Sequence, residues 1–143
     1  MAINLFKPED LHKIADDIEM AKLKEALAKK RKKEDSEREL KEAFMSREIR
    51  SDGPERLARA LRNAAENGQR EVMPLQFPSD WCKDKGRAIN NFDPDWPKSL
   101  DGFAARAYDY YEKNLQPLGY KLDARILNYP DGMPGDVGLF LRW

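Results

Sequence analysis

Two glycine-containing segments carry the residues best suited to bind a ligand in this 143-residue chain. Glycine permits positive φ angles and a close approach of the backbone to a ligand, while arginine and asparagine side chains donate hydrogen bonds to anions. One segment lies within residues 78–98, and the other is the turn at residues 130–136. The candidate ligand-binding residues are Arg87, Asn90, Asn91, Asp131 and Asp136. The sequence therefore leaves open a ligand-binding or enzymatic site between the two segments.

The same residues also have a purely structural interpretation. Aspartates beside proline and glycine commonly form turns by hydrogen bonding to their own backbone, which predicts a rigid turn at residues 130–136. Neither segment carries a phosphate-binding pattern, and the spacing of the aspartates matches no calcium-binding loop. We therefore predict no catalytic residue, no metal site and no cofactor, and we favour a protein that is not an enzyme.

Cys82 and His12 are the only cysteine and the only histidine of the chain. Two lysines close to Cys82 would favour its thiolate, but two aspartates equally close would oppose it. A nucleophilic cysteine also needs a base beside it, and His12 lies far away in the sequence. We interpret Cys82 as a buried structural residue and His12 as a surface residue. A single cysteine cannot form an internal disulfide, which favours a cytoplasmic location.

Charge sets limits on the partners of the protein. The 26 basic and 26 acidic residues cancel, so no overall field attracts nucleic acid or an anionic membrane. The local exception is one basic run. It consists of Lys29, Lys30, Arg31, Lys32 and Lys33. A helix would distribute these side chains around its axis, and acidic residues follow at once, so nucleic-acid binding is the weaker alternative. No run of eighteen apolar residues occurs, so we expect no membrane insertion.

The N-terminal third of the chain predicts one long helix. Pro8 suits the first helical turn, and the acidic residues Glu9 and Asp10 follow it where the helix dipole favours negative charge. Apolar residues recur at spacings of three and four on both sides of a charged middle, residues 29–39. They are Leu11, Ile14, Ile18, Met20, Ala21, Leu23, Leu27, Leu40, Ala43 and Phe44. Residues 1–50 are therefore predicted to form a helical arm that is charged and partly solvated.

Residues 51–143 predict a compact domain. A helical apolar pattern occupies residues 54–67, and residues 71–77 alternate as in a strand. Pro74 cannot donate a ladder hydrogen bond, which predicts that this strand is short or lies at an edge of the sheet. Residues 78–98 predict an ordered, irregular loop that is longer than most structureless connections.

The end of the chain predicts a further helix and a hairpin. Ser99 is placed to cap a helix that Pro117 and Gly119 would end. Residues 120–126 and 137–143 alternate between apolar and polar side chains, which is the pattern of half-buried strands. We therefore predict an α+β fold in which a long N-terminal charged helix precedes two further helices, packed on a small antiparallel sheet with a C-terminal hairpin.

The apolar residues of the arm are the main indication of function. A helix cannot bury its own side chains, so residues 8–50 should contact the domain of the same chain, a second copy or another protein. Self-association is preferred because homo-oligomers are common, and the imperfect heptads favour a short helical bundle over a long coiled coil. The sequence thus predicts a non-enzymatic protein–protein interaction or oligomerisation module.

Overall fold

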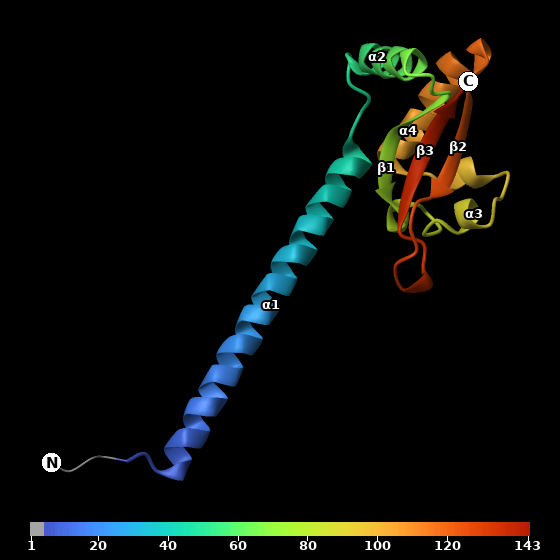
Figure 1. Ribbon diagram of the computed structural model, residues 1–143. Helices are drawn as coiled ribbons and strands as arrows, with labels where there is room; N and C mark the ends of the chain where they lie inside the picture. Colours follow the sequence, from blue (N-terminus) through green and yellow to red (C-terminus); the bar gives the residue numbers. More distant parts are fainter. Residues whose placement is uncertain (1–4) are drawn as a thin grey trace. The chain divides into compact units, whose positions relative to one another are not determined.

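The computed structural model describes residues 5–143 and confirms the predicted α+β fold (Figure 1). The chain divides into two compact units, Met1–Glu42 and Ala43–Trp143. The first unit contains most of the long helix α1. The second contains the last turn of α1, the shorter helices and a three-stranded sheet.

Helix α1 spans Pro8–Ser46, so the long N-terminal helix is confirmed. Its first turn is fixed locally, because an Asp10 carboxylate oxygen accepts a hydrogen bond from the backbone N–H of Lys7 at 3.3 Å. Ion pairs join neighbouring turns of the helix, Lys29 to Glu25 at 3.3 Å and Arg38 to Asp35 at 3.5 Å. Each such exposed pair adds only about 0.2–0.5 kcal/mol to the stability of the helix.

The sheet consists of β1 (Glu71–Pro78), β2 (Lys121–Ile126) and β3 (Asp136–Arg142), in the order β1-β3-β2. Both pairings are antiparallel, so β2 and β3 form the predicted C-terminal hairpin. Strand β1 is an edge strand, as Pro74 predicts. The register between β1 and β3 is irregular between Val72 and Leu75, which is where the proline interrupts the ladder.

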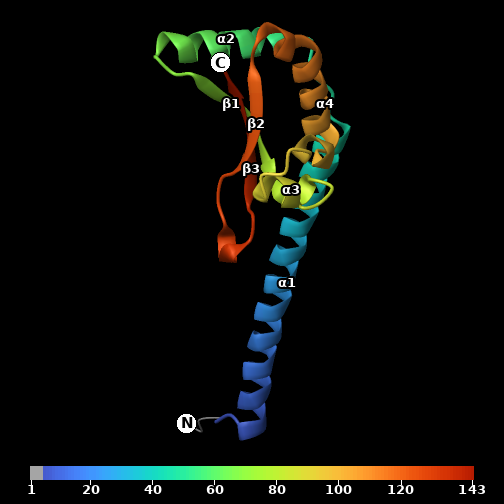
Figure 2. The same cartoon turned by 90° about the vertical axis from the view of Figure 1, so that its right-hand side faces the viewer.

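The longer helices that lie wholly within the second unit are α2 and α4. Helix α2 spans Gly53–Glu66, with Pro54 in its first turn, and α4 spans Gly102–Tyr110. Figure 2 shows α4 along one face of the sheet and α2 across its end. The α4 chain continues through a π-helical turn, Tyr111–Leu115, and a short 3₁₀ turn, and it ends at Gly119 with φ of 104°. Glycine adopts this conformation without strain, so the predicted stop is confirmed.

The predicted cap of this helix is wrong. Asp101 caps α4, and its Oδ1 accepts a hydrogen bond from the Gly102 N–H at 2.9 Å. The Ser99 hydroxyl instead donates to the Trp96 carbonyl at 2.6 Å, within the 3₁₀ turn Trp96–Ser99. Both residue types are good caps, and the extended backbone at Asp101 decides between them.

The connection between β1 and α4 is irregular but contains short helical turns. It contains 3₁₀ turns at Ser79–Trp81 and Trp96–Ser99, and the single-turn helix α3 at Arg87–Asn90. Asp84 organises its middle, because its two carboxylate oxygens accept hydrogen bonds from the N–H groups of Gly86 and Ala88 at 3.0 and 2.9 Å. This agrees with the prediction of an ordered, irregular segment.

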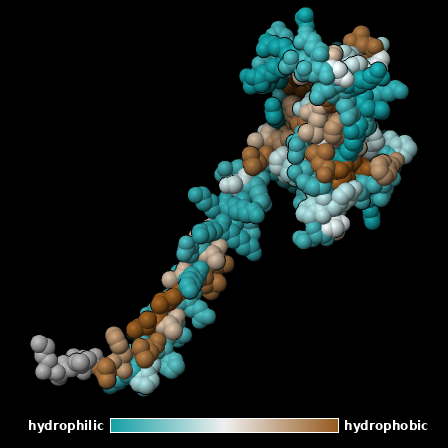
Figure 3. Space-filling model, in the orientation of Figure 1, coloured by the Kyte–Doolittle hydropathy of each residue, from teal (hydrophilic) through white to brown (hydrophobic). Residues whose placement is uncertain are grey.

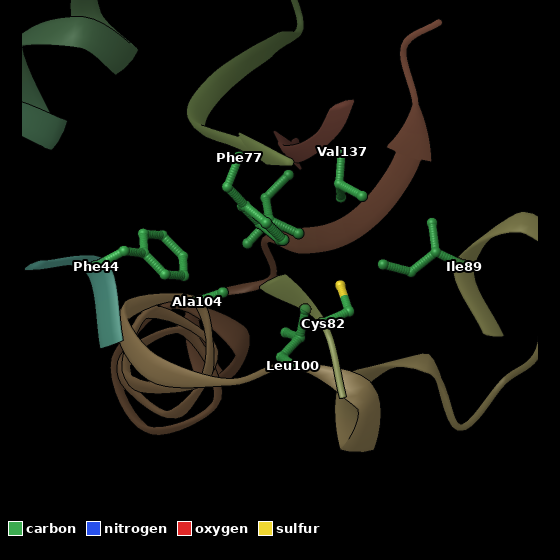
Figure 4. Packing of buried hydrophobic residues seen from close by; sticks show 8 residues of the cluster. Phe44, Phe77, Cys82, Ile89, Leu100, Ala104 and Val137 are labelled. Atoms are coloured by element: carbon green, nitrogen blue, oxygen red, sulfur yellow. The ribbon is translucent and has the colours of Figure 1, made fainter. Parts of the chain in front are cut away.

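The core of the second unit lies between the apolar face of the sheet and α4 (Figure 4). Val137 and Leu139 of β3 are buried against Ala104 of α4 and Leu100 before it, which confirms that the helix covers the hairpin. Figure 4 also shows Cys82 and Ile89 of the connecting segment reaching the same core. The core residues are Phe44, Phe77, Cys82, Ile89, Leu100, Ala104, Val137 and Leu139.

The last turn of α1 belongs to this core. The ring of Phe44 lies 4.7 Å from that of Trp81 and 5.3 Å from that of Phe77, measured between ring centroids. The Arg106 guanidinium donates hydrogen bonds to the carbonyls of Met45 and Arg47 at 2.8 and 3.0 Å, which satisfies carbonyls at the end of the helix. The second compact unit begins at Ala43, whereas the sequence placed the start of the domain at residue 51.

Candidate functional site

The most extensive exposed apolar surface on one element is on α1. Six large apolar side chains in its N-terminal half are between 44% and 56% exposed. They are Leu11, Ile14, Ile18, Met20, Leu23 and Leu27. Figure 3 shows apolar side chains gathered along this part of the helix, beyond a hydrophilic segment. Large exposed apolar surfaces are common at sites that bind proteins, membranes or ligands, which makes this part of α1 the candidate site.

These six residues form two triplets with the same spacing of three and then four. Leu11 and Met20 are nine residues apart, and the same separation holds for the second and third members of the triplets. Nine residues make two and a half helical turns, so the triplets lie on opposite sides of α1. A single flat partner cannot cover both triplets. A long coiled coil needs its apolar residues on one side of the helix, and those of α1 do not stay on one side.

The basic run Lys29–Lys33 lies in the middle of α1, and all five of its side chains are exposed. Consecutive residues of a helix are separated by about 100° around its axis, so these charges surround the helix instead of forming one basic face. Lys29 is also paired with Glu25. This arrangement supplies less phosphate-binding capacity than a one-sided cluster would.

The two segments predicted to form a ligand site do lie together. The Ser79 N–H donates to the Gly135 carbonyl at 2.8 Å, and the Ser79 hydroxyl donates to the Pro134 carbonyl at 2.9 Å. Near them, the Tyr129 hydroxyl donates to the Asn90 side-chain oxygen at 2.9 Å. Neither Ser79 nor Tyr129 stands out in the sequence, because a lone serine or tyrosine gives no signal before its distant partner is known.

The five candidate residues have different surroundings. The side chain of Asp136 accepts a hydrogen bond from that of Gln76 across the β1–β3 pair at 3.4 Å. Asp131 lies in the 3₁₀ turn Pro130–Gly132 with φ of 53°, a turn conformation that aspartate tolerates. Arg87 and Asn91 are exposed on and after α3. The two segments meet at a junction formed by the hydrogen bonds of Ser79 to the Pro134 and Gly135 carbonyls. The Asn90 side chain accepts its hydrogen bond beside this junction, from Tyr129.

Ser79→Ala should lower the free energy of unfolding by about 1 kcal/mol, because the hydroxyl is buried and its removal leaves the Pro134 carbonyl without that donor. Urea denaturation followed by tryptophan fluorescence measures the change. The matched control, Asn91→Ala at an exposed position of the same connection, should change the stability by less than about 0.5 kcal/mol. Equal stability of the two variants would contradict a structural role for the junction.

Cys82 and His12 have the surroundings that the sequence predicted. Cys82 is buried, and this burial raises the pKa of its thiol to about 12, with a further contribution from the negative charge of Asp84. The backbone of Gly86 partly opposes this increase in the pKa. Because only the thiolate is a strong nucleophile, the raised pKa makes Cys82 a weak nucleophile near neutral pH. His12 is exposed on α1.

The face of the sheet that α4 does not cover carries a charged cluster centred on Arg125. Its guanidinium donates to Glu71 of β1 at 2.7 Å and to Asp123 of its own strand at 2.8 Å. It also lies 4.0 Å from the centre of the Phe140 ring, in a cation–π contact. Asp123 further accepts a hydrogen bond from Arg142 at 2.7 Å. The members of the cluster are paired with one another and join all three strands.

An apolar cavity of about 350 Å³ lies between α2 and α4 over the end of the sheet. Leu57 and Ala60 line it from α2, and Phe103 and Tyr110 line it from α4. Ala64 is the buried residue of α2, and Leu57 and Leu61 of the same helix are half-buried. The sequence did not predict this cavity, because its walls come from segments far apart in the chain.

Within residues 5–143, no three histidine, cysteine, aspartate or glutamate side chains are grouped closely enough to hold a metal ion. In the same part of the chain, no helix combines the length and the apolar character needed to cross a membrane. No protein family model, no curated protein and no solved structure matches this chain.

Proposed function

We propose that the protein is a non-enzymatic interaction module that associates with further copies of itself through α1. The observation that carries this proposal is the exposure of six large apolar side chains on one helix. Burial of a fully exposed leucine or isoleucine side chain contributes about 1.5–3 kcal/mol, and these half-exposed side chains have roughly half of that still to gain. The helix therefore gains free energy from a partner that covers it.

A homo-oligomer is the partner that the features of α1 support best. The helix carries both acidic and basic residues along its length, so a second copy offers charges that complement those of the first. Closed homo-oligomers are also the commonest assemblies of soluble proteins. The cytoplasm, which the single cysteine favours, remains the proposed compartment.

Light scattering of the full-length chain over a range of concentrations tests the proposal. The wild type should have the mass of a dimer or a larger closed assembly. A variant with Leu11, Ile14, Ile18, Met20, Leu23 and Leu27 all replaced by Gln should have the mass of one chain, since glutamine keeps helix propensity while removing the apolar surface.

The matched control is Leu118→Gln, which removes one exposed apolar side chain from the second unit. This variant should keep the mass of the wild type. A wild type that stays monomeric at every concentration, or an unchanged mass after all six substitutions, would overturn the proposal.

Two further functions remain proposals. A small ligand could bind where Tyr129 meets Asn90, since this contact joins the segment at residues 78–98 to the residue just before the turn at residues 130–136. Nucleic acid could bind to Lys29–Lys33, and absorbance at 260 and 280 nm in the light-scattering run would reveal it. The dispersed arrangement of that run makes nucleic acid the weaker alternative.

A further inference from the structure

One side of α1 carries a continuous stripe of nine exposed residues. They follow one another at spacings of three or four, which keeps them within an arc of about 80° on a helix with 3.6 residues per turn. The stripe consists of Glu9, Lys13, Asp16, Met20, Leu23, Leu27, Arg31, Glu34 and Arg38. At a rise of 1.5 Å per residue it is about 44 Å long.

The charges of this stripe invert when it is read backwards from its centre near Leu23. Glu9 corresponds to Arg38 at the other end of the stripe, and Lys13 corresponds to Glu34. Asp16 corresponds to Arg31, and the apolar residues lie between these charges. Every charged residue of the stripe therefore has a partner of opposite sign at the same distance from the centre.

We propose that two copies of the chain pair antiparallel along this stripe, around a two-fold axis beside Leu23 and Lys24. The proposal rests on the proposed self-association and adds its surface and its direction. Met20, Leu23 and Leu27 of the two helices form the apolar centre of the pair. On each side of it, Asp16 of one copy faces Arg31 of the other, and Lys13 and Glu9 face Glu34 and Arg38 in the same way.

The charges disfavour the opposite direction. In a parallel pair in register, every charged residue of the stripe would lie beside its own copy, so that Asp16 faces Asp16 and Arg31 faces Arg31. Like charges placed side by side destabilise an association and select against that arrangement. Arg38 already contacts Asp35 of its own helix at 3.5 Å, and this pair is exposed enough to exchange for Glu9 of the partner.

The pairing also accounts for the hydrophilic middle of α1. Residues 29–39 contain no apolar side chain, yet three of them lie on the stripe. In the antiparallel pair they lie beside Glu9, Lys13 and Asp16 of the partner helix, so the charged segment sets the register and the direction of the contact. The apolar triplet at Leu11, Ile14 and Ile18 lies on the opposite side of α1.

A charge exchange tests the direction of pairing. Asp16→Arg should weaken self-association about tenfold, because arginine at that position faces Arg31 of the partner twice in each dimer. Arg31→Asp should weaken it similarly. The double variant should restore association to within about threefold of the wild type, because both contacts become attractive again with the signs exchanged. The dissociation constant of each variant is measured by sedimentation equilibrium, and circular dichroism verifies that α1 stays helical.

The matched control is Glu25→Arg, which makes the same charge change about 140° away from Met20 around the helix axis. It should alter the dissociation constant less than threefold. If single and double variants all associate as the wild type does, the antiparallel register is wrong while self-association stands. If the wild type does not associate at all, both proposals fail.

Cysteine cross-linking provides a second measurement. In the antiparallel pair, position 16 of one chain lies beside position 31 of the other, whereas the two copies of position 16 are about 22 Å apart. A mixture of Asp16→Cys chains and Arg31→Cys chains should therefore form a disulfide-linked heterodimer in air. Asp16→Cys chains alone should not cross-link, since a disulfide requires Cβ atoms about 4 Å apart. Efficient cross-linking of Asp16→Cys chains alone would overturn the antiparallel direction.

Discussion

Phe44→Ala should lower the free energy of unfolding of the second unit by about 3–5 kcal/mol, the usual loss when a buried phenylalanine is truncated. The ring is packed against Phe77, Trp81 and Phe103, with centroids 4.7 to 6.1 Å away. Its removal leaves a cavity where α1 enters the core, and Arg106 holds the chain there by hydrogen bonds, which restricts collapse around the cavity. Urea denaturation of the full-length chain measures the loss.

The control is Phe92→Ala, because Phe92 is in the same unit but 90% exposed. It should change the stability by less than about 0.5 kcal/mol.

A pair of truncations tests the same contact in another way. Removing residues 1–42 keeps Phe44 and should leave the melting temperature of the rest nearly unchanged, whereas removing residues 1–50 should lower it strongly. Similar melting temperatures for the two truncated chains would show that Phe44 is not part of the core.

Cys82 should react with iodoacetamide at pH 8 about a thousandfold more slowly in the folded protein than in urea. Burial raises the pKa of the thiol from 9.0 to about 12. At pH 8, below both values, each unit of increase in the pKa lowers the thiolate fraction about tenfold. The thiolate is the reactive form, and the side chain is also 95% shielded from the reagent, since only 5% of it is exposed.

The pH dependence gives a second readout of Cys82. In urea the rate should level off once the pH passes the ordinary thiol pKa. In the folded protein it should continue to rise tenfold per pH unit beyond that point, because the folded pKa is higher. An exposed thiol introduced by Ser36→Cys in a Cys82→Ala background serves as the control and should react at the unfolded rate. A native Cys82 that reacts as fast as this control would contradict its burial.

The sequence by itself determined the elements whose signals are local. The long helix, α2 and the hairpin follow from periodicities of 3.6 and 2 residues and from glycine and proline at their ends, all of which act within a few residues. The surface of α1 could be predicted for the same reason. Once a segment is helical and exposed, its numbering alone decides which side chains share a face, so the stripe from Glu9 to Arg38 needs no tertiary contact to define it.

Even local signals were ambiguous where two residues compete. Ser99 and Asp101 are both good helix caps. The Ser99 hydroxyl donates to the Trp96 carbonyl within its own 3₁₀ turn, and the Asp101 side chain caps the helix instead. The boundary of the second unit could likewise not be found from local sequence patterns. Phe44 has the same apolar spacing as the exposed residues of the arm, and only its contacts with rings from distant segments assign it to the core.

Tertiary structure alone decided the surroundings of the candidate site residues. The contacts of Ser79 with Pro134 and of Asn90 with Tyr129 join positions separated by 55 and 39 residues, and no local preference specifies such pairs. The raised pKa of Cys82 and the cavity between α2 and α4 arise in the same way, from the sum of many side chains brought together by packing. Backbone periodicity is a property of neighbouring residues, whereas burial, solvation and cavities depend on which distant segments meet, and only the folded chain determines that.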